Sequence, residues 1–198
     1  STLVPEALYS EEEKEIIYNF NIAGGPFENS ELGQDTVRHA NAFTIYHVDR
    51  PLMQLIAHHF PGASIRHYSG LMIQLLLMKF RNRDNHNTLY VNTGTSHVDM
   101  LRIRDKKLDY FNSFLYNTAE DLMYYLVFVV EQLKLNPETV ELIMMGEVEK
   151  HSPLSDTLHK YIRNISFIER NADFRYSFVF DQLPGHYYYN LFNASLCE

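Results

Sequence analysis

The sequence predicts an α/β fold, in which helices pack against a sheet built largely from one stretch of the chain. In residues 88–114, apolar and polar residues alternate in three runs, which indicates three strands. Polar turns at 93–96 and 105–107 separate these runs and predict antiparallel hairpins. A helical stretch over about 118–135 and a short apolar run over 140–145 follow. We therefore expect three antiparallel strands followed by a helix, a strand, a helix and a strand.

The helix expected after the third strand has a clear start signal. Asn117 or Thr118 is placed to act as its N-cap, and Glu120 or Asp121 stands at the spacing of a capping box. The body of this helix, LMYYLVFVVEQLKL, is apolar nearly all round. We therefore expect it to be buried on more than one side.

The first 40 residues contain few signals of regular structure. A helix is expected over 10–20 with Ser10 as its N-cap, and a glycine-rich loop over 21–35. Within this loop, Gly24-Gly25-Pro26 is a phosphate-cradle alternative, but no lysine follows at the spacing of a P-loop, so a plain turn is expected.

The remaining elements are short and closely connected. Asp49 is placed to cap a helix that starts near Pro51, and Ser152 to cap one that starts at Pro153. We expect strands at 41–48, 63–68 and 165–168, and helices at 51–60, 70–80, 153–162 and 187–192. Two domains are expected, an N-terminal segment over 1–40 and an α/β domain over 41–198.

The composition disfavours several classes of function. The formal net charge of −8 disfavours nucleic acid or an anionic membrane as a partner. The single cysteine, Cys197, excludes an intramolecular disulfide and a cysteine zinc cluster, and fits a reducing cytoplasm. No apolar run approaches the ~20 residues of a membrane span. The ten histidines lack the spacing of metal ligands, and nothing resembles a nucleophile elbow, so no metal site and no catalytic residue is expected.

The order of the elements and two short motifs resemble the second half of the actin-like ATPase fold, the ribonuclease-H-like fold of sugar kinases, Hsp70 and actin. Residues 92–99, NTGTSHVD, resemble the phosphate hairpin of the cell-division and pilus-assembly members. Residues 144–147, MMGE, resemble the adenosine turn. The stretches 117–135 and 189–198 also look like one bacterial family of unknown function that is assigned to this superfamily.

This resemblance implies a cofactor site for ATP and Mg²⁺, with phosphates on the hairpin amides and the base near the adenosine turn, across a cleft from the hairpin. The implied site residues are Asn92, Gly94, Thr95, Ser96, Gly146 and Glu147. Asn92 stands where the superfamily has an acidic residue, and it lacks the charge that favours a divalent cation. Glu147 stands where a second glycine is usual, and it adds negative charge beside an anion. The site is therefore expected to be degenerate and to bind Mg-ATP weakly.

Two neighbouring positions have alternative readings. His97 is either a strand-surface residue or a ligand contact, and Asp99 is either a metal-facing carboxylate or a half-buried hydrogen-bonding group. No first phosphate hairpin is recognisable in residues 1–40, so this segment is expected to be the remnant of, or the link to, a first half-domain.

Two classes of function stay open at this point. One is a non-catalytic interaction or scaffold module of the cytoplasm, with an unknown protein partner, that is a monomer or a weak dimer. The other is a nucleotide-binding ATPase of the sugar kinase, Hsp70 and actin superfamily. A complete gene with or without an acidic hairpin upstream would discriminate between them.

Overall fold

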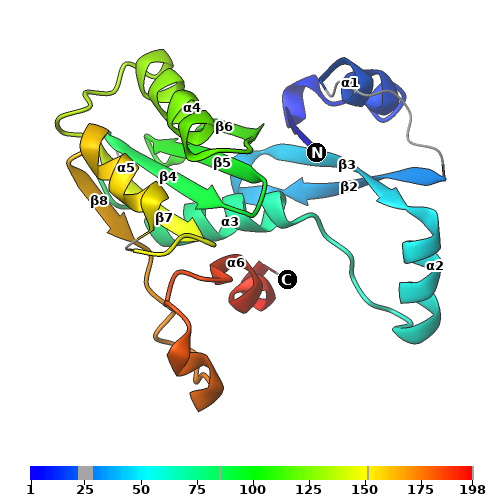
Figure 1. The fold of residues 1–198 in the computed structure, drawn as a ribbon. Helices are drawn as coiled ribbons and strands as arrows, with labels where there is room; N and C mark the ends of the chain where they lie inside the picture. The colour runs from blue at the N-terminus through cyan, green and yellow to red at the C-terminus, as the bar shows by residue number, and fades with distance from the viewer. Residues whose placement is uncertain (22–28, 85, 151, 198) are drawn as a thin grey trace. The chain divides into compact units, whose positions relative to one another are not determined.

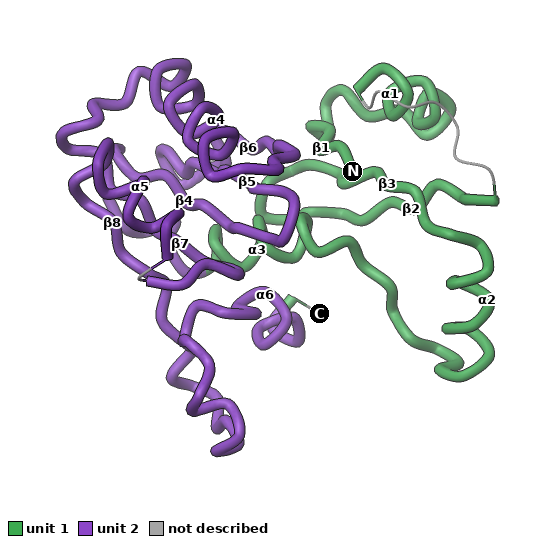
Figure 2. The backbone as a smooth tube through the Cα atoms, in the orientation of Figure 1, with its two compact units in different colours: residues 1–78, 197 green, residues 79–196, 198 purple. Residues whose placement is uncertain are grey.

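The structure is a computed structural model that describes residues 1–21, 29–84, 86–150 and 152–197. The chain forms two compact units, residues 1–78 with Cys197 and residues 79–196 (Figure 2). The units therefore divide after Met78, whereas the sequence suggested a boundary after residue 40. The Gly24-Gly25-Pro26 turn lies outside the described residues.

Unit 1 contains a three-stranded antiparallel sheet with the order β1-β3-β2 (Figure 2). Its strands are β1 (Thr2–Pro5), β2 (Ser30–Val37) and β3 (Ala42–Asp49). The strand expected at 41–48 is thus confirmed. The loop expected over 21–35 is wrong for residues 30–35, because Ser30–Val37 pairs along the whole of β3. Gly33 is suited to this strand because a Cβ there would lie 2.7 Å from the Tyr46 ring.

The helices expected at 51–60 and 70–80 are confirmed, whereas the helix expected over 10–20 begins at Lys14, so Ser10 is not its N-cap. The helices of the first 80 residues are η1 (Glu6–Leu8), α1 (Lys14–Asn21), η2 (Arg38–Ala40), α2 (Arg50–His59) and α3 (Tyr68–Phe80). Asp49 caps α2 as expected, since its Oδ1 accepts a hydrogen bond of 3.0 Å from the Leu52 amide. The strand expected at 63–68 is wrong, because the His67 amide donates to the Asp35 carboxylate instead of to a strand and α3 begins at Tyr68.

Unit 2 contains a five-stranded sheet with the order β6-β5-β4-β7-β8 (Figure 1). The strands are β4 (Thr88–Thr93), β5 (His97–Arg104), β6 (Lys107–Leu115), β7 (Glu141–Gly146) and β8 (Asn164–Phe167). β4, β5 and β6 are antiparallel, and β7 and β8 continue the sheet in parallel with β4. The predicted order of strands and helices is confirmed, with Tyr90 and Ile103 buried in the central strands.

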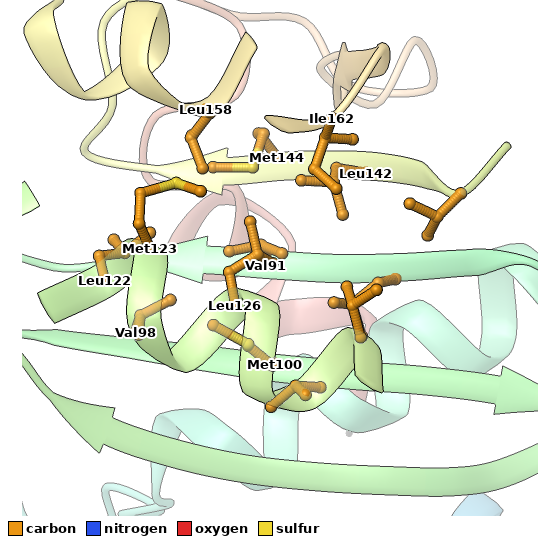
Figure 3. Close-up of a cluster of buried hydrophobic side chains, with 14 of the residues drawn as sticks. Val91, Val98, Met100, Leu122, Met123, Leu126, Leu142, Met144, Leu158 and Ile162 are labelled. Atoms are coloured by element: carbon orange, nitrogen blue, oxygen red, sulfur yellow. The ribbon is translucent and has the colours of Figure 1, made fainter. Parts of the chain in front are cut away.

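A hydrophobic core joins α4 (Ala119–Gln132) and α5 (Pro153–Tyr161) to this sheet. Figure 3 shows Leu126 of α4 and Leu158 of α5 directed towards Val91, Met100 and Met144 of the strands. The tail adds η3 (Phe178–Gln182), α6 (Tyr189–Phe192) and η4 (Ala194–Cys197). Across the described ranges, no helix combines the length and apolarity that a membrane crossing needs.

The start of α4 is as predicted, but the burial of this helix is not. Thr118 and Asp121 form the capping box, since each backbone amide donates to the other's side chain at 3.0–3.1 Å. Leu126 is fully buried, whereas Tyr124 and Phe128 are 67% and 46% exposed. The expectation of burial on more than one side is therefore wrong, because only one side of α4 packs on the sheet.

Candidate functional site

The two predicted motifs lie next to each other at one end of the sheet of unit 2. β4 and β7 are parallel neighbours, and their register places Thr93 opposite Gly146. The β4–β5 hairpin, with Gly94, Thr95 and Ser96 at its turn, therefore adjoins the end of β7. All six predicted site residues meet here, and the two motifs are neighbours in a single sheet.

Asn92 connects the two motifs. Its Nδ2 donates a hydrogen bond of 2.9 Å to Oδ2 of Asp99, and its Oδ1 lies 2.9 Å from where a Cβ on Gly146 would stand. The Asp99 side chain is fully buried and also accepts a hydrogen bond from the Ser113 hydroxyl. His97 Nε2 is 3.8 Å from Asp99 Oδ2. Asp99 is thus a buried, hydrogen-bonded carboxylate of the sheet.

This arrangement gives a physical reason for asparagine at position 92. An aspartate there would hold two carboxylates within hydrogen-bonding distance in a buried place, where like charges cannot both ionise without cost. The neutral amide of Asn92 instead supplies a donor to Asp99. The departure from the acidic residue of the superfamily therefore matches the surroundings of the side chain.

The turn of the hairpin is closed by its own hydrogen bonds. The Gly94 amide donates to the His97 carbonyl at 2.8 Å, and the Tyr116 hydroxyl donates to the Gly94 carbonyl at 2.6 Å. The Tyr116 amide donates to the Ser96 carbonyl at 3.0 Å. A Cβ on Gly94 would lie 2.3 Å from the His97 ring, so the imidazole lies against the Gly94 backbone. The Gly94 amide is therefore already engaged where a phosphate was expected, while Thr95 and Ser96 are exposed.

The turn after β7 is held from two directions. Gly146 has a φ of +89°, its amide donates to the His186 carbonyl at 3.1 Å, and the Glu147 amide donates to the Thr93 carbonyl at 2.7 Å. A side chain on Gly146 would meet that carbonyl at 2.1 Å, so glycine is required by both conformation and space.

His186 is the residue of this region that sequence reasoning missed. Its side chain is buried, and Nε2 lies 2.6 Å from the Val148 carbonyl. Because a carbonyl only accepts, Nε2 carries the proton. Burial lowers the pKa of His186 below its usual value, with the charge of Lys150 acting in the same direction. The irregular aromatic tail around residue 186 carries no pattern that would have indicated this contact.

The charge around the hairpin is negative. Glu147 is exposed. Burial of Tyr116 raises the pKa of its hydroxyl, and the negative charge of the Glu147 carboxylate raises it further. Burial raises the pKa of Tyr187, and the negative charges of Glu149 and Glu147 raise it further. Among the residues that the structure describes, no group of three or more histidine, cysteine, aspartate or glutamate side chains is arranged to hold a metal ion. The exposed carboxylates of Glu147 and Glu149 thus add negative charge beside the motifs.

Comparisons with known proteins agree with the fold. Residues 1–165 match a family described as "Protein of unknown function (DUF3822)". The chain is similar to a solved structure from Bacteroides thetaiotaomicron, a protein with actin-like ATPase fold and unknown function, at 25% identity and a TM-score of 0.75. That similarity covers 84% of this chain and 64% of the other, so the chain spans less than two thirds of its neighbour.

A second solved structure, an AlfA filament bound to AMPPNP, is 14% identical with a TM-score of 0.41, over 62% of this chain and 41% of that one. No curated protein matches the chain. The predicted actin-like ATPase fold is confirmed by the Bacteroides neighbour.

Proposed function

We propose that this chain, which belongs to the DUF3822 family of proteins of unknown function, is a non-catalytic interaction module with a degenerate nucleotide site. The observation that carries the proposal is that the polar groups of the predicted site bond to one another. Asp99 is satisfied by Asn92 and Ser113, and the Gly94 amide by the His97 carbonyl. The strand order β6-β5-β4-β7-β8 further supports a ribonuclease-H-like assignment of unit 2, and the single Cys197 supports a cytoplasmic protein.

Hydrogen bonding opposes nucleotide binding at the hairpin. A phosphate is bound by backbone amides that point at it without another acceptor. To use the Gly94 amide, a ligand would have to break the bond to His97, and each such exchange costs about 1 kcal/mol net. The turn amides of Thr95 and Ser96 alone offer a small part of the donor set that a triphosphate needs.

Charge opposes nucleotide binding as well. The carboxylate of Glu147 acts on the Tyr116 hydroxyl, which itself binds the Gly94 carbonyl. A phosphate at the hairpin would therefore lie in the field of Glu147. Like charges at ~4 Å repel by about 1 kcal/mol in water and by several times that when partly buried. Together with the missing charge at Asn92, these terms predict Mg-ATP dissociation constants weaker than about 1 mM.

Isothermal titration calorimetry of the complete protein with Mg-ATP tests this proposal. Asn92→Asp combined with Glu147→Gly should strengthen binding, because position 92 would then present a second carboxylate beside Asp99 for the cation. Asn92→Asp with Glu149→Gly is the matched control, because Glu149 acts on Tyr187 and not on Tyr116. Its affinity should stay below that of the first pair.

Micromolar binding by the unmodified protein that disappears on Gly94→Val would overturn the proposal. Because a valine there would also meet the His97 ring, circular dichroism of the variant must match that of the parent. Binding that survives Gly94→Val would place the nucleotide elsewhere.

The alternative function is an ATPase of the actin-like superfamily. The exposed Thr95 and Ser96 at the hairpin turn favour it. Phosphate release from Mg-ATP by the complete protein, abolished by Asp99→Asn, would move this alternative to first place. We expect no release above the buffer rate.

A further inference from the structure

Strand β2 forms an open edge of the sheet of unit 1. Within the described residues, the sheet order β1-β3-β2 leaves one side of β2 without a neighbouring strand (Figure 2). β2 pairs with β3 over its whole length without a register shift, and Gln34 and Thr36 are exposed. The strand contains no proline, lysine or arginine. This edge is therefore long and regular, and such edges favour the addition of another strand.

The hydrogen bonds to β3 show which backbone groups of β2 point outwards. The Arg50 amide donates to the Asn29 carbonyl at 2.9 Å, one residue beyond the first pair of the β2–β3 ladder. Because such bonds alternate along an antiparallel pair, the odd-numbered residues of β2 bond to β3. The amides and carbonyls of Leu32, Gln34 and Thr36 therefore point towards the open edge. Across the described ranges, no hydrogen bond outside the ladder involves these groups.

The other sheet edges carry features that block an added strand. On β6, the Ser113 amide already donates to Oδ1 of Asn112 at 2.9 Å, and the register with β5 shifts beside Arg102. β1 and β8 have only four residues each, and β1 ends at Pro5, which lacks an amide hydrogen. Short strands, prolines and irregular pairing are the usual protection of sheet edges. Among the described strands, β2 is thus the long edge without such protection.

The open edge of β2 is complementary to itself. Leu32 and Thr36 lie equally far from Gln34 along the strand, on either side of it. When two such strands run antiparallel with Gln34 on a two-fold axis, Leu32 faces Thr36 of the other copy and Gln34 faces its own counterpart. Every outward amide and carbonyl of these residues then has an acceptor or a donor.

We propose that β2 pairs in this way with β2 of a second copy of this chain, and so joins the two sheets of unit 1 into one. Charge favours this register. Glu31 would face Val37 of the other copy, and Asp35 would face Gly33. With Gly33 on the axis instead, Glu31 would face Asp35 of the other copy, and like charges directly opposite each other destabilise a sheet. The inference rests on the proposed function as an interaction module and names its partner.

The geometry of this contact sets its strength and its outcome. A single pair of short strands covers less than the roughly 800 Å² per partner of a standard interface, so the association is weak and depends on concentration. The contact is isologous, since both copies use the same surface. Because pairing occupies the open edge of both copies, the assembly stops at a dimer.

Sedimentation velocity of the full chain without nucleotide tests the proposal. The weight-average sedimentation coefficient should rise with protein concentration and level off at the value of a dimer. Thr36→Pro removes an outward amide that β3 does not use, and should weaken association by roughly tenfold or more. Thr36→Ala keeps this amide and is the matched control, with association unchanged. Circular dichroism of both variants must match that of the parent.

Opposite charges at position 34 test the register without proline. Gln34→Glu and Gln34→Lys each place like charges across the two-fold axis, and each should weaken association by roughly two- to fivefold. A mixture of the two variants brings opposite charges together and should restore association as a heterodimer. Gln54→Glu and Gln54→Lys, at an exposed position of α2, are the matched controls and should behave like the parent alone and mixed.

Amide hydrogen exchange measured by NMR locates the contact. The outward amides of Leu32, Gln34 and Thr36 should exchange more slowly as protein concentration rises. The amides of Glu31 and Gly33 already bond to β3 and should change little. Concentration-dependent protection of a different strand or helix, without protection of these three amides, would place the contact elsewhere and overturn the inference.

Three further results would also overturn it. They are a wild-type chain that stays monomeric over the whole concentration series, a Thr36→Pro variant that associates like wild type, and a charge mixture without heterodimer. Its failure is distinguishable from failure of the proposed function, because the two rest on different measurements. Micromolar Mg-ATP binding in calorimetry would contradict the degenerate site while leaving the nucleotide-free association as found.

Discussion

Gly146→Ala is the substitution whose effect follows most directly from the structure. Gly146 ends β7 with a φ of +89°, opposite Thr93 of β4. A Cβ there would lie 2.1 Å from the Thr93 carbonyl oxygen and 2.9 Å from Asn92 Oδ1. Neither neighbour is the flexible end of a long side chain, so the β7 turn itself must move away from β4.

Three contributions make up the expected loss of stability. The left-handed backbone costs a non-glycine residue about 1–2 kcal/mol. Forcing an extra carbon into a packed site costs about 1–3 kcal/mol. The hydrogen bond of 2.7 Å from the Glu147 amide to the Thr93 carbonyl must lengthen, at about 1 kcal/mol. We expect unit 2 to lose about 3–6 kcal/mol, which reaches the lower limit of total domain stability.

Gly62→Ala is the matched control. Gly62 has a φ of +87°, and a Cβ there would meet nothing within 4 Å, so only the backbone contribution of about 1–2 kcal/mol applies. Urea denaturation followed by hydrogen exchange measures each loss in the unit that carries the substitution. Peptides from β4 and β7 report on Gly146→Ala in unit 2, and peptides from the α2–α3 connection report on Gly62→Ala in unit 1. Equal losses for the two alanines would refute the reasoning, because the close approach at Gly146 would then contribute nothing.

Two further predictions concern the surroundings of this turn and the start of α4. Burial lowers the pKa of His186 in the folded protein below its usual value of 6.5. In the pH range between 6.5 and the lowered pKa, the unfolded chain therefore binds more protons than the folded protein. The free energy of unfolding consequently falls as the pH decreases through this range. His186→Gln keeps a donor for the Val148 carbonyl without titrating, and urea midpoints at a series of pH values should show a smaller acid-side loss than in wild type. Thr118→Ala removes the side-chain half of the capping box with Asp121 and should cost about 1 kcal/mol in the same denaturation assay, and an unchanged midpoint would contradict a role for this cap.

Much of unit 2 could be predicted from the sequence because its signals are local. The alternation over residues 88–114 places the strands, and Thr118 and Ser152 mark helix starts through bonds to amides three residues away. The positions of the candidate site were also recognisable, since each lies in a short motif. These features depend on neighbours in the chain, which is why the sequence alone contains them.

Other features depend on partners that are distant in the chain. Ser30–Val37 forms the strand β2 because it pairs with β3, although the sequence of residues 30–35 by itself predicts a loop. The Asp35 carboxylate accepts a hydrogen bond from the His67 amide, and the Asp99 carboxylate accepts one from the Ser113 hydroxyl. Because each pair is distant in the chain, no local sequence pattern indicates either contact.

The sequence by itself determined the order of strands and helices along unit 2 and the helix caps at Asp49, Thr118 and Ser152. Only the tertiary structure decided that Asn92, Gly94 and Gly146 are engaged with Asp99, His97 and His186, and that one side of α4 is exposed. The physical reason is that a hydrogen-bonding group or an apolar side chain has many alternative partners in an unfolded chain. Packing alone selects one of them.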